Sequence, residues 1–126
     1  MTILAISHMV PEALRAAKIL EEEHGIGCEI IDPRTLSPLD EKIVLKSVKK
    51  TGRLLIVDYG WNTGGVAAQI ASVIAEKAFG DLTAPIQRIC LPDTPTPGAP
   101  NLEAAFYPGA EDIVRLVRRM LKGQSR

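Results

Sequence analysis

The sequence has 126 residues and equal numbers of basic and acidic side chains, fifteen of each. This length suits one domain with a sizeable core, and the lack of a basic surplus gives no support to nucleic acid as a partner. No apolar run approaches the roughly 20 residues of a membrane span, and the start of the chain does not resemble a signal peptide. We therefore expect one domain over residues 1–126, in a cytoplasmic or organelle-matrix setting, with no nucleic-acid or membrane partner.

Strands and helices are predicted to alternate along the chain. Short apolar runs bounded by Gly or Pro indicate strands, and apolar residues repeating every three or four positions indicate helices. The expected strands cover residues 2–7, 28–31, 54–57 and 86–91. The expected helices cover residues 9–24, 37–50, 64–79 and 111–122, with one or two helical turns at 101–106 and fraying at 124–126.

Residues 37–40 contain the signals of a helix start. Ser37 is a plausible N-cap, Pro38 suits the first helical position, and Asp40 places an acid in the first turn. Residues 92–100 contain four prolines, which exclude a helix or a central strand and predict a stiff extended loop.

Residues 53–79 are the stretch on which the rest of the fold depends. A buried strand is followed by Gly60, which allows a sharp turn, and Asn62 or Thr63 can cap the helix that Gly64 and Gly65 open. The helix has two stripes at helical spacing. The bulky stripe, expected to face the sheet, is Val66, Ile70, Val73 and Ile74. The small stripe, expected to face a helix of this or another chain, is Gly64, Ala68, Ala71 and Ala75.

Alternating strands and helices predict a parallel sheet sandwiched between helices, an α/β fold of three layers. Ligands of such sheets bind beyond the carboxyl ends of the strands. Asp32, Asp58 and Asp93 would converge there and could bind a cation, although such acids more often cap turns. His8 could act as a general base at the same edge, but the sequence supplies no partner for it.

Metal and disulfide sites find little support in the sequence. His8 and His24 are isolated and neither lies near a cysteine pair, so no metal-ligand spacing is present. Cys28 and Cys90 lie in predicted strands among apolar neighbours, which is more typical of buried thiols than of a disulfide. We assign no catalytic, cofactor-binding or metal-binding residue.

Several segments together resemble the carboxy-terminal domain of the transketolase superfamily. Residues 7–17 and 31–40 (IDPRTLSPLD) carry the general resemblance. Residues 49–53 (KKTGR), 60–66 (GWNTGGV) and 92–97 (PDTPTP) are most similar to the beta subunit of the thiamine-dependent decarboxylase component of pyruvate, branched-chain and acetoin dehydrogenase complexes. The resemblance covers nearly the whole chain and is specific only in combination.

The resemblance implies a three-layer α/β/α sandwich whose four parallel strands lie in the order second, first, third, fourth. In the family an antiparallel edge strand normally precedes this segment, and we expect it to be absent here. The family's thiamine diphosphate and magnesium sites lie in other domains, so this domain is expected to bind neither itself. Its implied partners are further copies, an alpha subunit and the acyltransferase core.

Residues near the end of the central helix depart from the family pattern. Family members have an acid at Thr83, which can help to hold the basic docking module of the acyltransferase, and Asp81 could substitute for it. We assign Asp81 and Thr83 as candidate partner-docking residues. The candidate interface comprises Trp61, Gly64, Gly65, Ala68, Ala71 and Ala75.

Three functions remain open from the sequence. The first is a non-catalytic subunit-assembly and docking domain of a 2-oxo acid dehydrogenase beta subunit or a transketolase-like split subunit. The second is an independent enzyme using the strand-end pocket. The third is a stand-alone regulatory module that binds a small anion at Thr63, Gly64 and Gly65, although close helix packing is the simpler role for the two glycines. Trp61 could be an exposed interface anchor or a lid over the sheet end.

Overall fold

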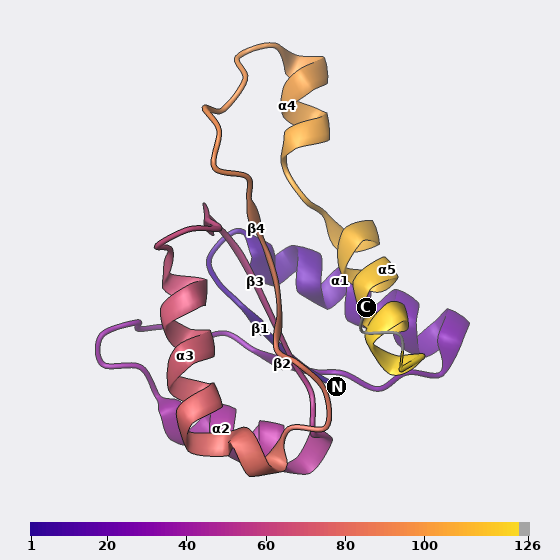
Figure 1. Cartoon of the computed structure of the whole chain (residues 1–126). Coiled ribbons are helices and arrows are strands. Elements are labelled where there is room, and N and C mark those ends of the chain that lie inside the picture. The colour runs from indigo at the N-terminus through magenta and orange to yellow at the C-terminus, as the bar shows by residue number, and fades with distance from the viewer. Residues whose placement is uncertain (124–126) are drawn as a thin grey trace.

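The computed structural model describes residues 1–123, in which strands and helices alternate as expected (Figure 1). The strands are β1 (Thr2–Ala5), β2 (Glu29–Ile31), β3 (Leu54–Trp61) and β4 (Gln87–Leu91). The helices are α1 (Met9–His24), α2 (Glu41–Thr51), α3 (Val66–Ala78), α4 (Pro100–Phe106) and α5 (Ala110–Leu121), and a 3-10 turn, η1 (Phe79–Asp81), follows α3. The expected fraying at residues 124–126 lies outside the described residues.

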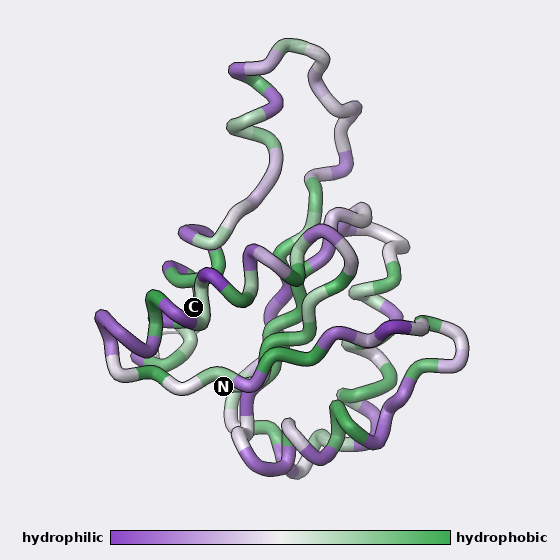
Figure 2. Tube along the Cα trace, turned by 180° about the vertical axis from the view of Figure 1, so that it is seen from behind, coloured by the Kyte–Doolittle hydropathy of each residue, from purple (hydrophilic) through white to green (hydrophobic). Residues whose placement is uncertain are grey.

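The four strands form one parallel sheet in the order β2-β1-β3-β4, which confirms the predicted topology. β3 is central, and Leu54 to Val57 are fully buried because helices cover both faces of the sheet. The strands form the apolar centre of the molecule, while the helices alternate in hydropathy (Figure 2). Within residues 1–123, β2 and β4 are the two edge strands, and no antiparallel strand pairs with β2.

Alternate residues of the strands separate two cores, as a pleated strand requires. Ile3, Leu55 and Val57 point toward α1 and α5, which close one face of the sheet. Leu4 and Ile56 point toward α2 and α3, which close the other face. The predicted three-layer α/β/α sandwich is therefore confirmed.

The start of α2 differs from the prediction. The helix begins at Glu41, and its N-cap is Asp40, whose carboxylate accepts the backbone N–H of Ile43 at 3.4 Å. Ser37 is not the cap, because residues 36–39 form a turn in which Leu36 and Leu39 bridge and the Thr35 hydroxyl donates to the carbonyl of Pro38. The first helical turn thus starts where a carboxylate satisfies its free N–H groups.

The start of α3 also corrects the prediction. β3 continues through a bulge at residues 58–60 to Trp61, so the turn follows Trp61 rather than Gly60. Gly65 is the N-cap in an extended conformation, and neither Asn62 nor Thr63 caps the helix. Val66, placed first in α3, is 38% exposed and does not join the sheet-facing stripe.

Ile70 and Ile74 face the sheet as predicted, and Ala67 and Ala78 join them there. In α1, Met9, Ala13, Ala16 and Leu20 are buried, whereas Leu14 is 55% exposed. The predicted sheet-facing stripe of α3 is therefore right at Ile70 and Ile74 and wrong at Val66.

Residues 92–108 form an arm that leaves the sheet at the carboxyl end of β4, carries α4 and returns to α5 (Figure 1). The Tyr59 hydroxyl donates to the carbonyl of Pro108 at 3.0 Å, and the Tyr59 ring packs against Tyr107 with ring centroids 5.0 Å apart. Burial raises the pKa of Tyr59, so its hydroxyl stays a donor across the neutral range. The end of the arm that returns from α4 to α5 is thereby fixed to β3.

Candidate functional site

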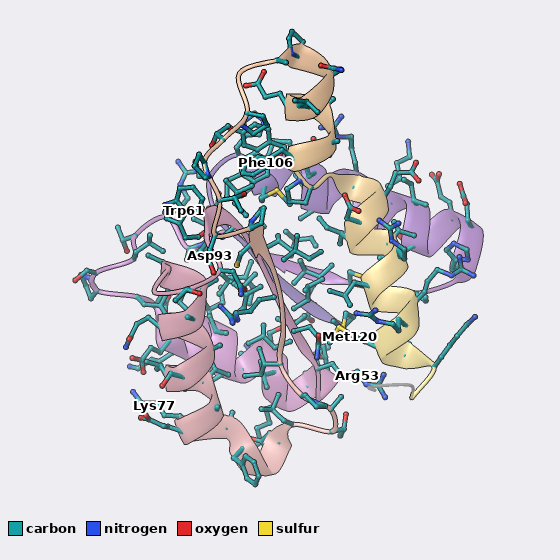
Figure 3. All side chains as sticks on the ribbon, turned by 45° about the horizontal axis from the view of Figure 1, so that its top comes forward. Arg53, Trp61, Lys77, Asp93, Phe106 and Met120 are labelled. Atoms are coloured by element: carbon teal, nitrogen blue, oxygen red, sulfur yellow. The ribbon has the colours of Figure 1, made fainter. Side chains whose placement is uncertain are left out.

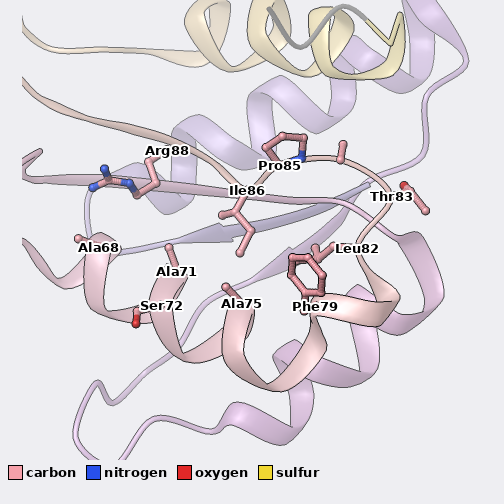
Figure 4. A pocket seen from close by; sticks show the side chains of 11 residues that line it. Ala68, Ala71, Ser72, Ala75, Phe79, Leu82, Thr83, Pro85, Ile86 and Arg88 are labelled. Carbon is pink, nitrogen blue, oxygen red and sulfur yellow. The ribbon is translucent and has the colours of Figure 1, made fainter.

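An apolar groove of about 770 Å³ lies between α3, η1 and β4 (Figure 4). Its apolar or small lining residues are Ala68, Ala71, Ser72, Ala75, Phe79, Leu82, Ala84, Pro85 and Ile86. Thr83 and Arg88 complete the wall. We call this surface the α3 groove.

The α3 groove exists because the outward face of α3 lacks bulky side chains. Ala68, Ala71 and Ala75 recur at intervals of three and four residues, which places them on one side of the helix. A methyl group fills little of the space between a helix and a strand, so the groove stays open beside Ile86. The sequence predicted this stripe of alanines, and the structure assembles it with Thr83 in one surface.

The two ends of the α3 groove differ in chemistry. Arg88 lies beside Ala68 at one end, where its guanidinium donates to the carbonyl of Asn62 at 2.8 Å (Figure 4). Phe79 stands at the other end and is 80% exposed. Asp81 lies in the same 3-10 turn as Phe79 and is also exposed. The α3 groove therefore has the cation of Arg88 at one end, and the aromatic ring of Phe79 with the acid of Asp81 at the other.

Thr83 has a local structural role. Its backbone N–H and its hydroxyl both donate to the carbonyl of Gly52, at 2.8 and 3.1 Å. Gly52 has a φ of +70°, and an added Cβ would lie 2.9 Å from the Thr83 hydroxyl. The threonine thus links the end of α2 to the wall of the α3 groove.

The turn between β3 and α3 is held by a carboxylate. Asp93 accepts the backbone N–H of Thr63 at 3.0 Å and its hydroxyl at 2.5 Å. The hydroxyl and then the N–H of Thr63 hold the pKa of Asp93 below its ordinary value. The Thr63 donors that an anion would use are thus already bound to a side chain of the same protein.

The two glycines of the turn have geometric roles. Gly64 has a φ of +71°, which favours glycine, and a Cβ on Gly65 would lie 2.2 Å from the carbonyl oxygen of Trp61. The close approach at Gly65 is to the backbone of its own turn, so close packing of the two glycines against another helix stays a prediction. The anion site at Thr63, Gly64 and Gly65 stays a prediction without a ligand to support it.

Trp61 is 46% exposed and borders a hollow of about 370 Å³ with Thr63, Asp93 and the start of the arm. Trp61 and Asp93 lie near each other at the carboxyl end of the sheet, far from Arg53 and Met120 at the opposite end (Figure 3). None of Trp61, Gly64 or Gly65 lines the α3 groove. The predicted interface residues thus fall into two groups. The three alanines line the α3 groove, whereas Trp61, Gly64 and Gly65 belong to the turn between β3 and α3.

Sequence reasoning missed most of the groove wall. Phe79 follows Ala75 by four positions, so the helical spacing could have extended the stripe to it. Leu82, Pro85 and Ile86 had no such signal, because a loop and an edge strand bring them to α3. Arg88 is placed by its register opposite Ile56 in β3.

The residues at the strand ends form no catalytic constellation that we can assemble. The His8 ring stacks on Tyr59 with ring centroids 5.4 Å apart, and Asp32 pairs with Arg34 at 3.5 Å. Among residues 1–123, no three His, Cys, Asp or Glu side chains are grouped so as to hold a metal ion. The predicted convergence of Asp32, Asp58 and Asp93 on a cation finds no support there.

The two cysteines are half-buried free thiols, as the sequence predicted. Burial raises the pKa of both Cys28 and Cys90, which keeps them protonated at neutral pH. Neither is activated as a nucleophile.

Comparison with known proteins places the fold in a family. The model of the family described as "Transketolase, C-terminal domain" matches residues 1–113. The chain belongs to the transketolase C-terminal domain family. This finding confirms the resemblance that was drawn from the sequence motifs.

Relatives within the family include subunits of two oxidoreductases. The chain is 44% identical over 119 residues to the pyruvate dehydrogenase E1 component subunit beta of Rickettsia felis, covering 94% of this chain and 36% of the relative. It is 47% identical over 118 residues to the mitochondrial pyruvate dehydrogenase E1 component subunit beta of Pisum sativum, covering 94% and 33%. It is 44% identical over 122 residues to the acetoin:2,6-dichlorophenolindophenol oxidoreductase subunit beta of Cupriavidus necator, covering 97% and 36%.

This member of the family therefore spans about a third of the length of these curated relatives. None of the helices within residues 1–123 has the length and hydropathy needed to cross a lipid bilayer.

Proposed function

We propose that this domain is a non-catalytic assembly and partner-docking domain of a thiamine diphosphate-dependent 2-oxo acid dehydrogenase beta subunit. The observation that carries the proposal is the α3 groove, an apolar surface that includes Ala68, Ala71 and Ala75 on a transketolase C-terminal fold. Apolar concave surfaces without convergent catalytic groups are typical of protein-binding sites. The similarity to beta subunits of pyruvate and acetoin enzymes supports the class of parent enzyme.

In this proposal the chemistry belongs to the parent enzyme. Thiamine diphosphate and magnesium would be bound by other domains, since a diphosphate needs several free donors and magnesium needs carboxylates. Within residues 1–123, the Thr63 donors are occupied by Asp93. The partners would be a second copy, an alpha subunit and the acyltransferase core, with Asp81 and Thr83 as the docking residues beside the groove.

The proposal is tested by separating assembly from catalysis. The chain alone should not turn over pyruvate or acetoin when thiamine diphosphate and magnesium are supplied. It should bind itself, or the alpha subunit of a pyruvate dehydrogenase E1 component, and Ala71→Leu should weaken that association because leucine fills the groove. Ala104→Leu adds the same atoms to an exposed position on α4 and should leave association unchanged. Turnover by the chain alone, or association unaffected by Ala71→Leu, would contradict the proposal.

A small-anion module remains the alternative. Calorimetric titration with phosphate and thiamine diphosphate tests it separately, and heat that Thr63→Ala abolishes would favour it over the assembly role.

A further inference from the structure

Strand β4 is an open edge of the sheet with a hollow on each of its two faces. Within residues 1–123 it pairs with β3 alone, so the backbone groups on its other side have no strand to bond. Successive side chains of a strand point to opposite faces. Arg88 lines the α3 groove on one face, and Ile89 lines a hollow of about 270 Å³ beside α5 on the other. We call this second surface the α5 hollow.

The two surfaces together outline the space of a further strand. No residue of β3 lines either of them, so both lie on the outer side of β4. Figure 1 shows α3 and α5 on either side of β4. A strand added about 4.8 Å from β4 would point alternate side chains into the α3 groove and into the α5 hollow. The geometry of this edge therefore suits an extended segment.

The charges around the open edge favour an acidic segment. The charged side chains that line the two surfaces are Arg88, Arg115, Arg119 and Asp112. Asp112 pairs with Arg115. Within residues 1–123, neither Arg88 nor Arg119 forms a salt bridge, so two cations beside β4 have no carboxylate partner. A carboxylate on an added strand would supply one, whereas a basic segment would be repelled.

We propose that β4 binds an extended acidic peptide as a fifth strand, with apolar side chains in the α3 groove and carboxylates facing the α5 hollow. The inference rests on the proposed docking function and names the chemistry of one partner. Main-chain hydrogen bonds supply affinity in this mode, and the pockets for alternate side chains supply specificity. β4 has five residues and lies between Pro85 and Pro92, so the matching segment is about five residues long.

The other edge strand provides an internal comparison. β2 has only three residues, so it has fewer backbone groups to pair with an added strand. The hollow beside it, which includes Lys46 and Lys50, lies against α2. Lys50 is already paired with Glu29. An acidic peptide should therefore bind along β4 in preference to β2.

The experiment titrates the whole chain with three short peptides that have blocked termini, and follows the backbone amides by NMR. The first peptide alternates valine and glutamate, the second has lysine in place of each glutamate, and the third has the composition of the first with its glutamates grouped at one end. The first should bind with a Kd below about 1 mM and slow hydrogen exchange of alternate amides in β4. The other two should bind at least about tenfold more weakly, because one reverses the charge and the other breaks the alternation.

Two exposed cations give a matched pair of variants. Arg119→Ala removes a cation of the α5 hollow and should raise the Kd of the first peptide by about three- to fivefold. Lys46→Ala removes an exposed cation beside β2 and should leave this Kd unchanged. Both side chains are exposed, so both variants should fold.

Three results overturn the inference: no binding of the first peptide at about 1 mM, equal binding of the lysine peptide, or protection of amides that spares β4. Protection of β4 that grows with the concentration of the chain alone would show that another copy occupies the edge, and would also overturn it. If Ala71→Leu weakens association with the alpha subunit while no peptide protects β4, the assembly function stands and the added strand is wrong.

Discussion

The two sides of α3 differ in what surrounds them. On the sheet side, Ala67, Ile70 and Ile74 are buried against Leu4 and Ile56, and the space is filled. On the outer side, Ala71 and Ala75 face the α3 groove and only part of the surface is covered. The same helix therefore has one side packed against the sheet and one side that is only partly covered. Small residues therefore stabilise the fold where the sheet covers them, and they leave an open surface where no element of this chain covers them.

The largest expected effect comes from a substitution on the sheet side of α3. Ile70→Ala removes buried methyl groups and leaves a cavity against the sheet, and should lower the free energy of unfolding by about 2–5 kcal/mol. Urea or thermal unfolding measures it. Leu102→Ala, an exposed truncation of similar size, should change the free energy by less than about 0.5 kcal/mol. Equal losses in the two variants would mean that the sheet side of α3 is not a packed core.

A second effect is expected where β3 passes into α3, since this turn orients both sides of the helix. A Cβ at residue 65 would lie 2.2 Å from the Trp61 carbonyl oxygen, so Gly65→Ala must displace backbone and should lower the free energy of unfolding by about 1–3 kcal/mol. Gly80→Ala, which meets no atom within 4 Å, is the control. A Gly65→Ala variant as stable as the Gly80→Ala variant contradicts the close approach.

A smaller effect on stability should come from removing the hydrogen bond between Thr83 and Gly52. Thr83→Val keeps the shape of the side chain but removes its hydrogen bond to Gly52, and should cost about 0.5–1.5 kcal/mol of stability. Thr96→Val, at an exposed position in the arm, should cost nothing measurable. If Thr83→Val alters association more strongly than unfolding, the threonine contacts a partner directly and is not only a clamp.

The smallest expected effect is a pH dependence of the free energy of unfolding, which arises from Asp93 at the turn between β3 and α3. The hydroxyl and N–H of Thr63 lower the pKa of Asp93 in the folded state, so the carboxylate stabilises the fold fully above its ordinary pKa of about 3.9. That stabilisation is lost as the pH falls through the lowered pKa. The difference in unfolding free energy between wild type and Asp93→Asn should be constant near neutral pH and shrink in acid. A difference that grows in acid has the wrong sign for this account.

Much of the fold could be predicted from the sequence because burial on both faces leaves a strong apolar pattern. The strands themselves and the bounds of α1 follow from such patterns and from Gly25, whose φ of +65° ends the helix. The strand order, in contrast, was implied by the family resemblance and not by any apolar pattern. The start of α2 could not be placed, because Ser37 and Asp40 are both good N-caps and only the folded turn at residues 36–39 decides between them.

The site was predicted in part for a similar reason. Ala68, Ala71 and Ala75 are near in sequence, so helical spacing finds them. Their opposite wall comes from a loop and an edge strand that the topology alone brings near. Trp61 was grouped with them in the sequence, yet the turn held by Asp93 places it outside the groove.

The central claim, that one side of α3 serves stability and the other serves assembly, is tested most directly by measuring two adjacent variants in two assays. Ile70→Ala and Ala71→Leu should be compared by unfolding and by sedimentation under the same conditions. The account predicts that Ile70→Ala loses stability, whereas Ala71→Leu keeps it within about 0.5 kcal/mol and loses association. Parallel losses of stability and association in both variants would contradict it.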